Sequence, residues 1–363
     1  MIVIRNYFIF LYFVCSVNLF NAQTTIPFVD FNNYFQSFQG ESVRMIELQR
    51  ILDYKVGDEF VSYIDNRGNL RLFDGEEIKD ITNLNVEYQV SDHLMTWKVG
   101  PTLNLWDNGK QQTLTFNARN YQVRDSIVVF EDLRYNAVKV YYNGSIYDLY
   151  SVVSELSLPV FIGENIVAFR DNGDFYKVFW RGKIYDLGVW NGMIEFQGGT
   201  DVLTFNDPTM RTFAVFEQGE FLDVENFFMN KYKAGRGFIV YEDLNHNLIY
   251  YARGEKKSLT YFSAKFWRVI DDLVVWEENG FVYAFFEGLK YEVCNFIPDD
   301  FQLKNGTFAF KNVLGGISIF VKGKVIELTN QEVQSYHIYG NSVIVQLFNN
   351  AYVIYSNGKI HKI

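Results

Sequence analysis

Side chains suited to catalysis or metal binding are few and scattered in this sequence. Its four histidines lie far apart, and no two of them have the spacing of metal ligands: His93, His246, His337 and His361. The sequence contains no nucleophile elbow, Walker A loop or dinucleotide-binding glycine fingerprint. It therefore predicts no catalytic residue, no cofactor and no metal site, and it favours a non-enzymatic protein.

Pairs of acidic residues recur along the chain, notably Glu131-Asp132, Glu242-Asp243 and Glu277-Glu278. A ring of carboxylates could bind Ca²⁺ or act as an acid/base pair on a glycan. However, the pairs occupy the same place in successive units, which is typical of turns where Asp and Asn side chains accept backbone N–H groups. We interpret them as structural. The alternative function is an envelope enzyme that processes glycans or peptides, with acidic residues at a central channel.

Trp190 is the one candidate for an exposed binding residue. It lies outside the regular pattern described below and is followed by the flexible pair Asn191-Gly192, in one of the longer intervals of the chain. The competing interpretation is a tryptophan buried at a sheet edge. Gly198-Gly199 and Gly315-Gly316 precede no predicted helix, so we interpret them as turn glycines rather than phosphate loops.

The elements that position these side chains follow a regular spacing of glycines. Each unit has an apolar strand with a central aromatic, such as Val128-Val129-Phe130, then an acidic or amide turn and a second strand that runs into the glycine. A third strand follows the glycine, and a weaker fourth precedes the next unit. Nine glycines recur at intervals of 34 to 38 residues: Gly75, Gly109, Gly144, Gly182, Gly219, Gly254, Gly288, Gly323 and Gly358.

Four short antiparallel strands in about 35 residues are typical of one blade of a β-propeller. Nine repeats therefore predict an all-β fold, a single β-propeller of about eight or nine four-stranded blades. Residues 43–48 resemble an additional strand of the kind that follows each glycine. Three arrangements therefore remain open: nine blades, eight blades with a displaced unit, or an open arc. The aromatic content of 18% is explained by packing between blades.

The N-terminal segment predicts export. Arg5 precedes an apolar run over residues 7–17, and Ala22 offers a small residue for cleavage, so residues 1–22 resemble a signal peptide. Residues 23–42 are predicted to form an N-terminal arm, helical or extended, and residues 43–363 the repeat domain. Cleavage leaves Cys294 as the single thiol, and we interpret it as a small buried side chain. The predicted location is the periplasm or the cell surface.

The formal net charge of −10 argues against nucleic-acid binding, because phosphate backbones require clusters of Lys and Arg. The leading hypothesis is an exported binding or scaffold propeller whose partner is a protein or a cell-envelope component. A structural envelope component assembled from copies of itself is a weaker alternative.

Two units in particular, residues 126–149 and 165–187, resemble blades of WD-like and TolB-like propellers. They also resemble uncharacterised exported repeat proteins of Gram-negative bacteria that carry the same aromatic strand, Asp/Asn turn and Asn-Gly hairpin. The resemblance covers about residues 43–363, and the Gly-His and Trp-Asp dipeptides of true WD repeats are missing. It implies a rigid binding scaffold and transfers no functional residue.

Overall fold

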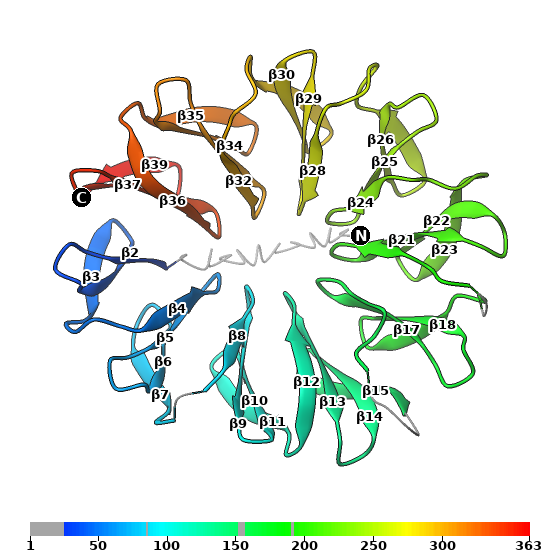
Figure 1. The fold of residues 1–363 in the computed structure, drawn as a ribbon, viewed down its shortest axis with the longest axis horizontal. Helices are drawn as coiled ribbons and strands as arrows, with labels where there is room; N and C mark the ends of the chain where they lie inside the picture. The colour runs from blue at the N-terminus through cyan, green and yellow to red at the C-terminus, as the bar shows by residue number, and fades with distance from the viewer. Residues whose placement is uncertain (1–24, 85, 152–156, 190–191) are drawn as a thin grey trace, which may run out of the picture.

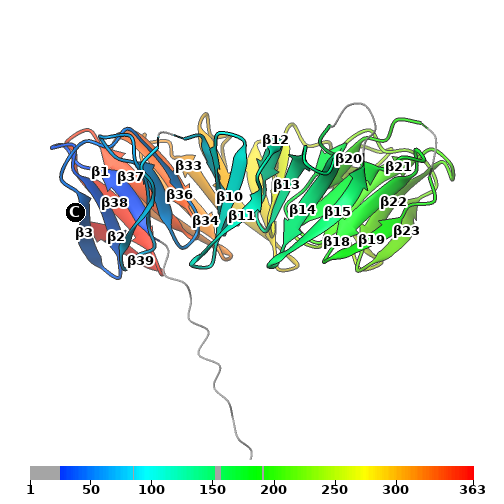
Figure 2. The same cartoon turned by 90° about the horizontal axis from the view of Figure 1, so that it is seen from below.

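The protein is a flat, closed ring of antiparallel sheets (Figures 1 and 2). The structure, a computed structural model, describes residues 25–84, 86–151, 157–189 and 192–363. The predicted signal peptide lies outside these residues. No helix in the described part of the chain is long and apolar enough to cross a membrane.

The first five sheets, or blades, run from β1 to β19. Blade 1 contains β1 (Ile26–Val29), β2 (Phe35–Gln39) and β3 (Ser42–Glu47). Blade 2 contains β4 (Asp53–Val56), β5 (Val61–Ile64), β6 (Leu70–Phe73) and β7 (Ile78–Thr82). Blade 3 contains β8 (Tyr88–Val90), β9 (Leu94–Val99), β10 (Thr102–Asp107) and β11 (Lys110–Thr115). Blade 4 contains β12 (Ala118–Val123), β13 (Ile127–Asp132), β14 (Ala137–Tyr142) and β15 (Ser145–Ser151). Blade 5 contains β16 (Phe161–Ile162), β17 (Ile166–Arg170), β18 (Tyr176–Trp180) and β19 (Lys183–Asp186).

The remaining five blades run from β20 to β39. Blade 6 contains β20 (Phe196–Gly198), β21 (Val202–Asp207), β22 (Thr212–Glu217) and β23 (Glu220–Glu225). Blade 7 contains β24 (Tyr232–Ala234), β25 (Ile239–Glu242), β26 (Leu248–Ala252) and β27 (Glu255–Ser258). Blade 8 contains β28 (Trp267–Ile270), β29 (Leu273–Glu278), β30 (Phe281–Phe286) and β31 (Leu289–Cys294). Blade 9 contains β32 (Phe301–Lys304), β33 (Thr307–Lys311), β34 (Ile317–Val321) and β35 (Lys324–Thr329). Blade 10 contains β36 (Val333–Tyr339), β37 (Ser342–Leu347), β38 (Tyr352–Ser356) and β39 (Lys359–Lys362).

In each four-stranded blade we call the strands inner, second, third and outer, in chain order from the centre of the ring to its rim (Figure 1). Because consecutive strands are antiparallel, the inner–second and third–outer turns lie on one side of the disc, here called the hairpin face. The second–third turns and the connections between blades lie on the opposite side, here called the connector face.

The ring has ten blades, so the prediction of eight or nine is wrong. The additional unit is blade 1, whose glycine is Gly40, 35 residues before Gly75. Its β1 and β2 come from the segment expected to be an arm. The aromatic residues of that segment suggested a helix, but Asp30 ends β1 by accepting the N–H groups of Asn32 and Tyr34, both at 2.9 Å. The expected additional strand is the outer strand of blade 1, β3.

One contact is repeated between neighbouring blades. A side chain of an outer strand lies against the aromatic ring of the next blade's third strand, as for Tyr147 and Phe179, whose ring centroids are 5.3 Å apart. The same contact closes the ring, where His361 of β39 lies 4.9 Å from Phe38 of β2. The other pairs are Arg44–Phe73, Lys79–Trp106, Tyr185–Phe216, Lys257–Phe285 and Tyr291–Phe320. The aromatic residues before the glycines are therefore packing residues.

Blade 1 differs from the others because its three described strands correspond to the second, third and outer strands. The inner strands on either side of it contact each other directly. The hydroxyl oxygens of Tyr54 in β4 and Tyr339 in β36 are 3.4 Å apart, and Asn305 of blade 9 donates to Asp58 of blade 2 over 3.1 Å. Nine described inner strands therefore surround the centre of the ring.

Acidic side chains organise many second–third turns, which confirms their interpretation as structural. Asp171 accepts the N–H groups of Gly173 and Phe175 at 2.9 and 3.0 Å. Asp132 accepts the N–H of Arg134, and its buried neighbour Glu131 accepts an amide hydrogen bond from Asn120. The same turn forms at Asp65, Asp243 and Asn312.

Candidate binding site

Large apolar side chains are exposed mainly on the connector face and the outer strands. Two aromatic pairs are prominent, each in a connection between blades. Phe227-Phe228 precedes the inner strand of blade 7, and Tyr261-Phe262 precedes that of blade 8. Tyr261 is 82% exposed and Phe262 60%. Other exposed side chains on this face include Phe31, Leu84, Phe116, Met193, Met210, Leu244 and Phe348. Among the described residues, none of the large exposed apolar side chains lies in a hairpin-face turn.

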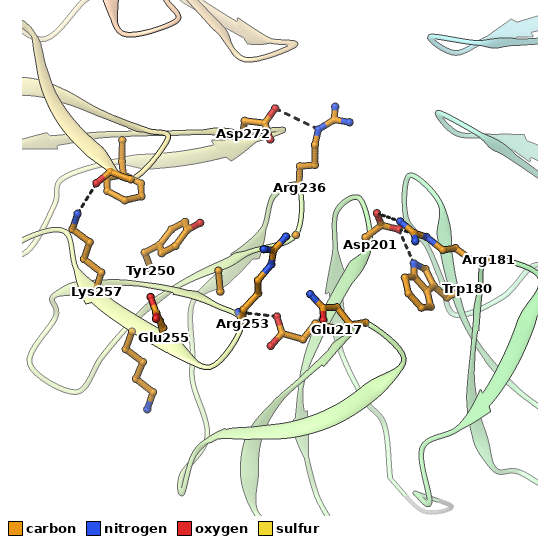
Figure 3. Close-up of a pocket in the computed structure, with 16 residues that line it drawn as sticks. Trp180, Arg181, Asp201, Glu217, Arg236, Tyr250, Arg253, Glu255, Lys257 and Asp272 are labelled. Carbon is orange, nitrogen blue, oxygen red and sulfur yellow. Dashed lines mark hydrogen bonds and ion pairs between the residues drawn. The ribbon is translucent and has the colours of Figure 1, made fainter. Parts of the chain in front are cut away.

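The hairpin face is polar and carries a hollow of about 1270 Å³ over blades 5 to 8 (Figure 3). Its lining carries five basic and four acidic side chains, and two of the ion pairs join neighbouring blades. Asp201 accepts the indole N–H of Trp180 at 2.7 Å and pairs with Arg181 at 2.9 Å. Although burial alone raises the pKa of Asp201, these hydrogen bonds hold it below its usual value. Arg236 likewise pairs with Asp272 at 3.4 Å.

Ion pairs along the hollow thus join neighbouring blades. The lining of the hollow carries little net charge that could attract a ligand. Lys257 donates to the carbonyl of Gly288 at 2.6 Å and lies over the ring of Phe285. The backbone N–H of Arg253 donates to Glu217 at 3.1 Å. Figure 3 shows these pairs along the edges of the hollow.

Four carboxyl groups of inner–second turns lie on the hairpin face around the centre of the ring and are here called the acidic collar: Asp58, Asp125, Glu164 and Asp271. Burial raises the pKa of each, and that of Asp58 reaches about 6, with the charge of Asp92 adding to the effect. Glu164 and Asp271 line a common cleft of about 230 Å³ beside β20, β24 and β28. In the described residues no three His, Cys, Asp or Glu side chains are grouped to hold a metal ion.

The collar makes stability depend on pH. The pKa of Asp58 rises from 3.8 to about 6 on folding, so its stabilising contribution is complete below about 3.8 and is lost as pH rises through about 6. We therefore expect Asp58→Asn to raise the melting temperature at pH 7.5, and this gain to shrink by pH 4.5. Calorimetry at both values measures it, with the exposed Glu220→Gln as control. An equal change in melting temperature at both pH values would contradict the raised pKa of Asp58.

The residues singled out from the sequence do not form one site. Trp190 lies outside the described residues, next to Val189, which is buried. His93 lies 3.6 Å from Asp125 in the collar. The other histidines are dispersed: His246 contacts Glu242 in a second–third turn, His337 stacks on Tyr339, and His361 packs on Phe38.

Cys294 is only half-buried, less than the buried position expected from the sequence. Burial raises the pKa of its thiol to about 11, which keeps the reactive thiolate rare at neutral pH. The Sγ atom lies 3.2 Å from the carbonyl oxygen of Phe296.

The exposed aromatic pairs Phe227-Phe228 and Tyr261-Phe262 were not predicted from the sequence as candidate binding residues. Their signal is two adjacent aromatic residues outside the strand pattern, repeated 34 residues apart.

A family model described as a 10-bladed beta propeller domain matches residues 19–361. No curated protein matches the sequence. The computationally designed Ika8 protein is 14% identical, with a TM-score of 0.36 over 92% of this chain and 99% of that one. The CRINKLY WD40 ectodomain of the Arabidopsis thaliana receptor kinase ACR4 is 7% identical, with a TM-score of 0.30 over 75% and 94%. Prp20p from Saccharomyces cerevisiae is 10% identical, with a TM-score of 0.30 over 57% and 74%.

Proposed function

We propose, from the premise that this chain belongs to the family of 10-bladed beta propeller domains, that it is an exported, non-enzymatic scaffold that binds a protein on its connector face. The observation that carries the proposal is the exposure of Phe227-Phe228 and Tyr261-Phe262 in adjacent connections. Exposed aromatic clusters are unfavourable in water unless a partner covers them, and aromatic residues dominate protein interfaces.

The ring itself suits this role because it holds the connections rigidly. Met229, which follows the first aromatic pair, is buried, and its backbone makes two hydrogen bonds with the side chain of Asn206 at 2.8 and 2.9 Å. Tyr261 follows the buried Thr260, and its N–H donates to Glu278 at 3.1 Å. The pairs are thus presented from anchored backbone, which reduces the entropy lost on binding.

A protein surface is a better match than an anionic membrane. The chain carries a net charge of −10, and acidic residues such as Glu225, Asp299 and Asp300 lie in or beside the connections. The net negative charge of the chain disfavours anionic lipid headgroups, whereas a protein with an apolar patch and a polar rim complements the mixed charges beside the aromatic pairs, such as Glu225, Lys231 and Lys265. Export is supported by the leader-like sequence of residues 1–22, and the partner would then be an envelope or extracellular protein.

Replacing Phe227, Phe228, Tyr261 and Phe262 together by serine is expected to weaken partner binding at least about 100-fold, because buried aromatic anchors each contribute about 1–2 kcal/mol or more. The purified chain and the variant are each used to capture proteins from a cell-envelope extract, and the affinity of the recovered partner is measured by calorimetry. The matched control replaces Ile146, Ile184 and Val325, exposed on outer strands, by serine. Recovery of no stoichiometric partner, or equal recovery with both variants, would refute the proposal.

The acidic collar supports a second candidate, an enzyme that processes an envelope glycan or peptide. Carboxyl groups from blades 5 and 8, Glu164 and Asp271, share one cleft, and burial raises the pKa of both. A raised pKa favours the protonated form that a general acid requires. Hydrolysis of cell-wall fragments by the wild type and its loss in Glu164→Gln would favour this candidate. Intact substrate in both reactions would exclude it for those substrates.

A further inference from the structure

A second cavity, of about 470 Å³, lies between the inner strands of blades 6, 7 and 8. It begins where the connections from the connector face enter β24 and β28 and is here called the wall groove. Its lining is basic and aromatic: Lys231, Lys233, Lys265, Arg268, Tyr232, Phe266 and Trp267, with Glu195 as its one acidic side chain. A volume of this size is within the range of small-molecule sites.

Two cations of the wall groove are not neutralised by neighbouring carboxylates. Lys231 pairs with Glu242 at 3.0 Å and Lys265 lies 3.7 Å from Glu277. Lys233, in contrast, donates to the neutral Gln197 at 3.2 Å. The guanidinium of Arg268 donates to the backbone carbonyl of Trp267 at 2.9 Å. Among the described residues neither Lys233 nor Arg268 forms an ion pair.

The basic character is a local departure from the repeat. Lys233 and Arg268 occupy equivalent positions of β24 and β28, 35 residues apart, because they pair with Val240 and Val275 of the neighbouring second strands. The same position holds Gln197 in blade 6 and Gln302 in blade 9. Packing between blades does not require a cation there, because neutral glutamines occupy the position in the adjoining units. In repeat proteins, such local departures map to binding surfaces.

We infer that the wall groove binds a small organic dianion, a phosphate monoester or a dicarboxylate, attached to a compact carbon skeleton. The ammonium of Lys233 and the guanidinium of Arg268 supply the two positive charges that the protein leaves unmatched. The half-buried rings of Phe266 and Trp267 offer an apolar wall for the skeleton. In a chain of net charge −10, this concentration of positive charge favours an anion locally.

The test uses three probes with the same six-carbon skeleton: glucose 6-phosphate, glucarate and glucose. Isothermal titration calorimetry of the full chain is expected to show binding of at least one dianion and no binding of glucose. Binding of glucose 6-phosphate alone would assign a phosphate ligand, and binding of glucarate alone a dicarboxylate. Raising the salt concentration tenfold is expected to weaken binding several-fold, because the contacts are ionic.

The variant Lys233→Gln/Arg268→Gln is expected to weaken dianion binding at least tenfold. The matched control, Lys183→Gln/Lys324→Gln, removes the same charge from exposed outer-strand positions and is expected to change binding less than twofold. Both variants alter exposed side chains, and unchanged melting curves verify their folding. The inference is overturned if no dianion binds the wild type, if glucose binds as tightly, or if both variants bind alike. None of these outcomes depends on the proposed protein partner, because the aromatic pairs stay intact.

Discussion

Replacing Phe38 by alanine is expected to lower the free energy of unfolding by about 3 to 5 kcal/mol, because a large buried ring is lost and leaves a cavity. Phe38 is 2% exposed and lies at the junction between the first and last blades. It packs there with Ile26, Ile344 and Ile354, and its ring lies 4.9 Å from that of His361. Denaturation in guanidinium measures the loss.

The matched control is Phe31→Ala in the same blade, where the side chain is 73% exposed, and its expected effect is within about 0.5 kcal/mol. A second comparison is Phe179→Ala, which removes the equivalent ring from the junction of blades 4 and 5. The polypeptide chain connects blades 4 and 5 directly, whereas blades 10 and 1 are held together by noncovalent contacts. Small-angle scattering is therefore expected to show partial ring opening in Phe38→Ala alone. A Phe38→Ala variant as stable as Phe31→Ala would contradict closure through this contact.

The second large effect is expected at Gly199. A Cβ atom there would lie 2.0 Å from the carbonyl oxygen of Gly235 in the next blade, far inside van der Waals contact. The two turns are also joined by a hydrogen bond from the N–H of Gly237 to the carbonyl of Thr200 at 2.8 Å. Gly199→Ala must push these backbones apart, and we expect a loss of about 3 kcal/mol in the free energy of unfolding.

Gly173→Ala is the control for this prediction. Gly173 lies in an exposed second–third turn, its nearest neighbour is the Phe175 side chain at 3.2 Å, and its φ is not in the left-handed region. Its substitution is expected to change stability by less than about 0.5 kcal/mol. Hydrogen exchange of the Gly237 amide offers a local readout, and it should accelerate in Gly199→Ala. An unchanged midpoint together with an unchanged exchange rate would show that the backbones are not in contact.

The blade itself was predictable from the sequence because it is built from local interactions. The glycines after the third strands adopt positive φ, as at Gly144 and Gly182, and the acidic residues of the turns bind N–H groups two to four residues away. The aromatic positions before these glycines were assigned to packing, and Phe179 and Phe216 are fully buried between blades. Each of these features depends on neighbours within one unit or the next.

The candidate sites were not predictable in the same way. Lys233 and Arg268 lie 35 residues apart, and they share a groove because inner strands of successive blades lie side by side around the centre of the ring. Glu164 and Asp271 share a cleft although blades 6 and 7 lie between them in the chain. No pattern of residue types within a unit indicates which side chains face the same cavity.

The repeat, the all-β class and the role of the glycines were determined by the sequence alone. The number of blades was decided by the tertiary structure. Closure depends on contacts between residues more than 280 positions apart, Tyr54 with Tyr339 and Phe38 with His361. It also depends on blade 1, whose three described strands correspond to the second, third and outer strands of the other blades. The physical reason is that the rotation between packed blades accumulates around the ring, and small differences in that rotation select ten blades rather than nine.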